Sequence, residues 1–156
     1  MASFASDIAH SHEKVSGPFI FKHPWIKIVE GSNNAALFVE IINTEKTPDS
    51  LIGAQSSNFQ KLALHSMEEE GGIYRMRSLE EMIIPANEKV LLAPGGDHVM
   101  LIGLKYPLLD GEFIPITLLF KRFGKVELNA LVESVNYNDK SNVKHSSEHK
   151  NMHNKQ

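Results

Sequence analysis

The sequence predicts an all-β fold from its short strand-like runs, its closely spaced turn residues and its lack of long helical patterns. The runs are rich in β-branched and aromatic residues and are bounded by Gly, Pro and Asn. This spacing is typical of a β-sandwich or Greek-key barrel rather than of alternating strands and helices. Glu68, Glu69 and Glu70 could begin one helical turn, but Gly71 and Gly72 would end it.

The expected strands follow one another through the middle of the chain. The first, residues 19–29, contains Pro24, whose missing N–H suits a strand start or an edge strand. The other expected strands are 36–43, 51–56, 60–66, 73–77, 83–86, 89–92, 98–104, 113–120 and 125–132. Turn signals separate them at 33–34, 47–49, 71–72, 94–96, 110–111 and 123–124. These elements together are enough for one all-β domain.

Composition divides the 156 residues into one domain and two tails. Hydrophobic residues make up 42% of the chain, and nearly all of them lie in residues 17–133, which are expected to form the folded domain. Residues 1–16 and 134–156 are small and polar. Since neither segment has the apolar residues needed to bury a core, both are expected to be flexible.

Charge and composition exclude several classes of function. The net charge is −3 and the pI is about 6.2, which does not suggest a nucleic-acid partner. No apolar run is long enough for a membrane span. The absence of cysteine excludes disulfides, zinc fingers, thiol catalysis and blue-copper thiolate ligation. No phosphate-binding loop or nucleophile elbow is present, so the six Met and eight His are the main chemical resource.

Four of these residues form a metal-ligand pattern. His98 and Met100 are two residues apart on an expected strand, so they face the same side. Alone, this pair is a weak signal, and His65 and Met67 form another like it. With His65 and Met76 the full pattern is His-x10-Met-x21-His-x-Met, which is far more specific than one pair.

The chemistry of these four side chains favours Cu(I). Thioether sulfur is soft and uncharged, so two Met and two His favour Cu(I) over Zn(II), Mg(II) or Ca(II). The set contains no carboxylate or thiolate to neutralise a divalent ion. Thioethers also hold copper less tenaciously than thiolates, which suits a protein that must release its ion.

Further segments extend the pattern beyond the four ligands. They are His23-Pro24-Trp25, Pro48-Asp49-Ser50-Leu51-Ile52-Gly53-Ala54, Leu62-Ala63-Leu64-His65, Gly72-Ile73-Tyr74-Arg75-Met76-Arg77, Ile84-Pro85-Ala86, Leu92-Ala93-Pro94-Gly95-Gly96-Asp97-His98-Val99-Met100-Leu101, Pro107-Leu108, Gly111, Pro115, Leu118, Phe120 and Gly124-Lys125-Val126. Over residues 20–132 the chain resembles the PCuAC-type periplasmic copper chaperones. Ile26 and Lys27 stand where that family usually has a small residue and Arg, so a partner contact through that Arg is not implied.

The resemblance implies a cupredoxin-like β-sandwich that binds Cu(I) in the periplasm and is not an enzyme. It implies a copper-accepting partner, either a cytochrome oxidase subunit or an assembly factor. The given N-terminus has no signal peptide, which is expected to have been removed. The protein is expected to act as a monomer without a membrane span or a nucleic-acid partner.

Several other residues have two interpretations. His145, His149 and His153, with Met152 beside the last, are spaced for one helix face and could form a secondary Cu(II) site, or they could belong to a solvated tail. Met67 could substitute as a ligand or simply neighbour the site. The whole chain also has two rival interpretations, a copper-dependent redox enzyme and a metal-free interaction module in which the four residues only pack.

Overall fold

A computed structural model describes residues 13–29 and 31–134, and within these ranges the chain forms eleven strands and no helix. The all-β prediction is confirmed. None of the described residues belongs to a helix that could cross a membrane. The strands are β1 (Glu13–Ser16), β2 (Phe19–Ile28), β3 (Ala35–Asn43), β4 (Asp49–Gln55), β5 (Phe59–Glu70), β6 (Ile73–Leu79), β7 (Met82–Ile84), β8 (Lys89–Leu92), β9 (His98–Leu104), β10 (Phe113–Phe120) and β11 (Gly124–Glu133).

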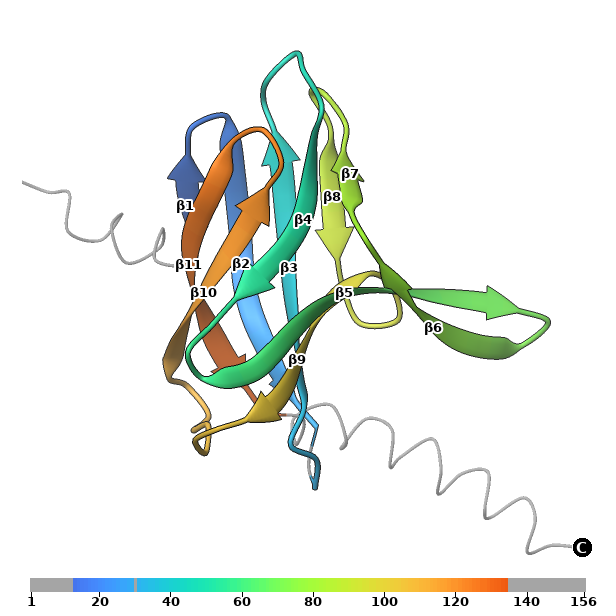
Figure 1. Cartoon of the computed structure of the whole chain (residues 1–156), viewed down its shortest axis with the longest axis vertical. Coiled ribbons are helices and arrows are strands. Elements are labelled where there is room, and N and C mark those ends of the chain that lie inside the picture. The colour runs from blue at the N-terminus through green and yellow to red at the C-terminus, as the bar shows by residue number, and fades with distance from the viewer. Residues whose placement is uncertain (1–12, 30, 135–156) are drawn as a thin grey trace, which may run out of the picture.

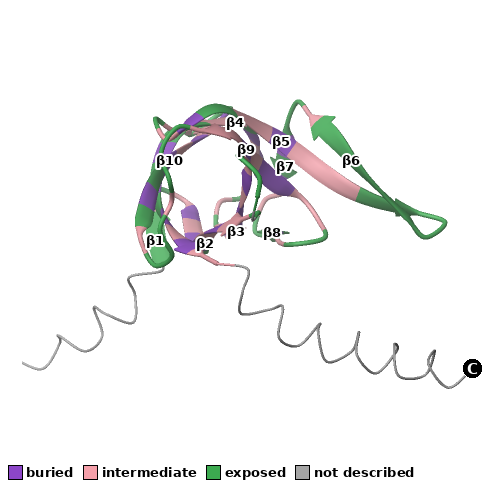
Figure 2. Cartoon of the chain, turned by 90° about the horizontal axis from the view of Figure 1, so that it is seen from below, coloured by how far each residue is buried: buried purple, intermediate pink, exposed green. Residues whose placement is uncertain are grey.

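All the strands belong to one hydrogen-bonded sheet. Its order is β6-β5-β9-β3-β2-β11-β10-β4-β7, with β1 added to β2 and β8 added to β3. The pairing of β11 with β2 is parallel, and the other pairings are antiparallel. The sheet curls back on itself to enclose the core, while the β5–β6 hairpin extends away from it (Figures 1 and 2). β6 is therefore the strand at one end of the sheet.

The core is built from alternate residues of the curled sheet. On β10 and β11 every second side chain is buried, including Ile116, Leu118 and Leu128, because successive side chains of a strand point to opposite faces. Phe19 stacks on Phe120, with 4.5 Å between ring centroids. Burial of this alternating set is the main source of stability for the domain.

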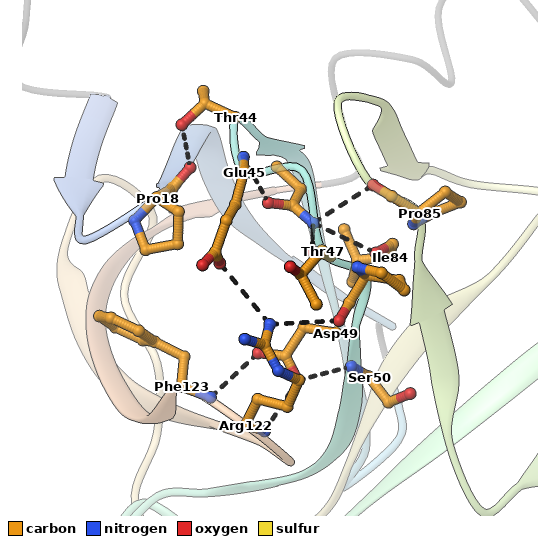
Figure 3. Close-up of polar contacts among 12 residues, drawn as sticks. Pro18, Thr44, Glu45, Thr47, Asp49, Ser50, Ile84, Pro85, Arg122 and Phe123 are labelled. Carbon is orange, nitrogen blue, oxygen red and sulfur yellow. Dashed lines mark hydrogen bonds and ion pairs between the residues drawn. The ribbon is translucent and has the colours of Figure 1, made fainter.

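A buried carboxylate fixes one end of the sandwich. Asp49 at the start of β4 is 4% exposed. Its Oδ1 accepts hydrogen bonds from the backbone N–H of Ser50 at 2.7 Å and of Arg122 at 2.8 Å, and its Oδ2 accepts one from Phe123 at 3.0 Å (Figure 3). The side chain thus joins the β10–β11 turn to β4. Nearby, the Asn43 amide donates to the carbonyl of Thr47 at 3.0 Å.

Two strands differ in detail from the sequence-based expectation. Pro24 lies neither at an edge nor at a strand start: it is inside β2, where the register with β3 shifts between Lys22 and Trp25 and His23 has a φ of 46°. A β-bulge at this point tolerates the missing N–H. β5 continues through Glu70, so the three glutamates belong to a strand and not to a helical turn. The end of the segment 1–16, which was expected to be flexible, forms β1 and pairs with β2.

Candidate metal centre

The two histidines of the pattern meet on neighbouring strands. His65 of β5 and His98 of β9 are directly opposite each other in the antiparallel register. Their rings are 5.7 Å apart between centroids and are arranged edge to face. Residues directly opposite in such a pair project from the same face of the sheet, so the imidazoles share one site.

The two methionines are diagonal neighbours of His65 on the same face. Met100 of β9 lies opposite Ala63, two residues before His65, and Met76 of β6 lies opposite Met67, two residues after it. Diagonal neighbours are about 7–8 Å apart, within reach of a long flexible side chain. The four residues therefore form a diagonal band across β6, β5 and β9, with His65 at its centre.

This band lies on the face of the sheet that points away from the main core. The intervening residues Leu64 and Val99 are opposite each other and are buried in the core. Exposure rises along the band: His98 is 4% exposed, His65 and Met100 are intermediate, and Met76 is 48% exposed. One end of the site is enclosed, and the other is open to an approaching molecule.

A backbone carbonyl selects one tautomer of the His98 ring. Its Nδ1 lies 3.0 Å from the carbonyl oxygen of Gly96, in the turn that precedes β9. A carbonyl can only accept, so Nδ1 carries the proton in the neutral ring. Nε2 then keeps its lone pair, which is the arrangement that a metal-binding histidine needs.

His65 has a buried ring nitrogen that makes no hydrogen bond. Its Nδ1 is the one buried side-chain nitrogen or oxygen without a hydrogen-bond partner in the part of the chain that the structure describes. Burial lowers the pKa of His65 below its usual value, and the charges of His98 and Lys61 lower it further. Its neutral form, which binds metals, therefore persists to lower pH than in an exposed histidine.

A row of aromatic rings backs His98. The ring centroid of Phe38 on β3 lies 6.1 Å from that of His98, and the ring centroid of Trp25 on β2 lies 5.0 Å from that of Phe38. Phe38 is buried, yet it shares the outer face with the site because its neighbours Leu37 and Val39 point into the core. Sequence reasoning did not identify Phe38. The sequence signal for it is the run of three apolar residues from Leu37 to Val39, because a strand with one buried face would have a polar residue at the middle position.

The donor set limits which metals this site could hold. Within residues 13–29 and 31–134, no group of three or more His, Asp or Glu side chains could bind a metal ion. Beside His65 and His98 the described residues therefore offer no third imidazole or carboxylate, and methionine sulfur is the other metal-binding side-chain donor on this face. The predicted tail ligands His145, His149, Met152 and His153 lie outside the described residues.

Comparisons with known proteins show similarity to two sets of relatives. Residues 20–132 match the family described as "Putative lipoprotein LpqE-like". The chain is 39% identical over 97 residues to the putative lipoprotein Lxx21020 of Leifsonia xyli subsp. xyli (strain CTCB07), an alignment that covers 62% of this chain and 58% of that relative. The chain therefore spans less than two thirds of this relative's length.

Solved structures of PCuAC domains have the same fold. A copper-bound PCuAC domain from PmoF2 has a TM-score of 0.68 and 30% identity over 79% of this chain and 98% of that one. The Cu(I)-bound solution structure of DR1885 from Deinococcus radiodurans has a TM-score of 0.62 and 26% identity over 85% of this chain and 88% of that one. The chain thus belongs to the LpqE-like family, which is of the PCuAC type.

Proposed function

We propose that the protein is a copper chaperone that holds one Cu(I) ion with His65, Met76, His98 and Met100 and passes it to another protein. The observation that carries this proposal is the convergence of two imidazoles and two thioethers on one outer face of β5, β6 and β9. The similarity to copper-bound PCuAC domains supports it.

The chemistry of the site favours carriage over catalysis. Four neutral donors, two of them soft sulfurs, bind Cu(I) in preference to Cu(II) and Zn(II). A copper redox enzyme needs a stable Cu(II) state and an open position for substrate. Two thioether ligands disfavour Cu(II). The half-exposed Met76 provides a place where an incoming ligand can displace a bound one. We therefore propose a function without enzymatic activity.

Similarity to known proteins supports the proposed location and the proposed acceptor. Lipoprotein relatives support a location outside the cytoplasm, which we propose is the periplasm. The resemblance to PCuAC-type chaperones further suggests delivery of copper to a cytochrome oxidase subunit or to an assembly factor. The tail residues His145, His149, Met152 and His153 are proposed as an auxiliary Cu(II) site that feeds the main one.

The experiment that tests this function is an anaerobic Cu(I) competition titration against a coloured chelator. We expect the intact chain and a chain ending at Ser134 to hold one tight equivalent each, because all four ligands precede the tail. Ending at Ser134 keeps the 2.8 Å hydrogen bond from its N–H to Asp110. Loss of tight binding on truncation would assign the copper to the tail and contradict the proposal.

The rival interaction module is tested by the oxidation of methionine. Bound Ag(I), a soft stand-in for Cu(I) that peroxide does not oxidise, should protect Met76 and Met100 from peroxide, since their sulfurs would be coordinated. The core residue Met82 should be equally slow with and without the ion. Mass spectrometry of the peptides measures each rate. Equal oxidation of Met76 with and without Ag(I) would favour the metal-free module.

A further inference from the structure

A third methionine belongs to the outer face that carries the candidate ligands. Met67 is two residues beyond His65 on β5, so both side chains project from the same face. It is also directly opposite Met76 in the β5–β6 register. Five potential copper donors therefore share this face, one more than the sequence pattern requires.

Met67 has no evident packing role. The core cluster of the described residues, with the partly buried side chains that pack against it, includes neither Met67 nor Met76. Beyond this pair on the same face lie Glu69 and Tyr74, which are opposite each other, and Tyr74 is 64% exposed. There is thus no apolar interior in the hairpin for Met67 to fill.

The Met67–Met76 pair lies on the way from the buried ligands to solvent. Exposure increases from His98, through His65 and Met67, to Met76 on the terminal strand β6. The hairpin that carries the pair projects clear of the rest of the domain (Figure 2). A copper acceptor could approach this hairpin without displacing any other described strand.

We propose that Met67 is a fifth copper ligand, and that with Met76 it forms the exit position from which Cu(I) leaves the imidazoles. The inference rests on the proposed function. In the exit step a bond from copper to the Met67 sulfur forms as the bond to His98 Nε2 breaks. One neutral donor replaces another, so the copper stays Cu(I) and no proton or electron is transferred. The acceptor then displaces His65 and the two thioethers in turn.

A double-mutant cycle tests the proposal in the full chain, with Met67→Leu, Met76→Leu and both together. We expect Met67→Leu to change Cu(I) affinity by less than about threefold and Met76→Leu to lower it about tenfold, because Met67 takes the vacated position. The double variant should lose about another tenfold relative to Met76→Leu. Met67→Leu should also slow copper transfer to a chelator of high affinity about tenfold, since it removes an intermediate ligand set.

Met82→Leu is the matched control, because Met82 is a buried core methionine away from the band, and it should change neither affinity nor transfer rate. Suppose that the double variant binds as well as Met76→Leu and that Met67→Leu transfers copper at the original rate. Met67 is then only a neighbour and the inference is overturned, while the proposed function stands. Absence of tight Cu(I) binding by the unmodified chain would instead remove the proposed function itself.

Discussion

Replacing His98 by Asn is expected to lower Cu(I) affinity on the order of 1000-fold. Loss of a side chain that only hydrogen-bonds to a metal ligand already lowers affinity by about 10–100-fold, and loss of the ligand itself should cost more. The Asn amide can still donate to the Gly96 carbonyl, as His98 Nδ1 does at 3.0 Å. What the variant lacks is the Nε2 lone pair at the buried end of the site. An anaerobic competition titration measures the change.

His23→Asn is the matched control for His98→Asn. His23 is an exposed histidine of β2 whose Nε2 lies 2.9 Å from the Oε2 of Glu133, and it is not one of the candidate ligands. This variant should bind Cu(I) with unchanged affinity. If both variants lost affinity equally, or if neither did, His98 would not be a ligand. Urea unfolding of each variant establishes that the fold is retained.

The largest expected effect on stability comes from Asp49→Ala. The substitution leaves the backbone N–H groups of Ser50, Arg122 and Phe123 without their acceptor. These three hydrogen bonds are partly buried, and a hydrogen bond to a charged group contributes about 1.5–3 kcal/mol, so we expect the free energy of unfolding to fall by about 3 kcal/mol or more. Equilibrium urea unfolding gives this value from the shift in midpoint.

Asp110→Ala provides the comparison, because the Asp110 carboxylate accepts one exposed hydrogen bond, from the N–H of Ser134. Its cost should be below about 1 kcal/mol. The folded fraction of Asp49→Ala should bind Cu(I) normally, since Asp49 is not among the four proposed copper ligands. A small change for Asp49→Ala would show that the β10–β11 turn holds its position without the carboxylate.

Local patterns in the sequence were sufficient for the fold class and for most of the strands. The alternation in residues 113–120 and 125–132 predicts β10 and β11, because one face of each strand is buried. Gly71 and Gly72 predict the turn between β5 and β6, where both have positive φ. Pro24 was misplaced because its bulge depends on the register between β2 and β3, which local sequence does not specify.

The residue types of the candidate site could be predicted, but their arrangement could not. Spacing along the chain shows that His98 and Met100 share a face, since they are on one strand. It does not show that His65 lies opposite His98, that Met67 lies opposite Met76, or that Phe38 backs the His98 ring. These relations depend on pairing between strands that are distant in sequence, and that pairing is a property of the whole fold.

X-ray absorption spectroscopy of the Cu(I)-loaded chain ending at Ser134 tests most directly whether the four residues hold the ion. If they do, the copper has both nitrogen and sulfur neighbours, and the sulfur signal weakens when Met67 and Met76 are both replaced by Leu, which leaves Met100 as the remaining sulfur ligand of the proposed centre. Since the chain has no cysteine, any sulfur must come from methionine. Coordination by nitrogen or oxygen alone, or a sulfur signal unchanged when Met67, Met76 and Met100 are all replaced by Leu, would contradict the proposed centre.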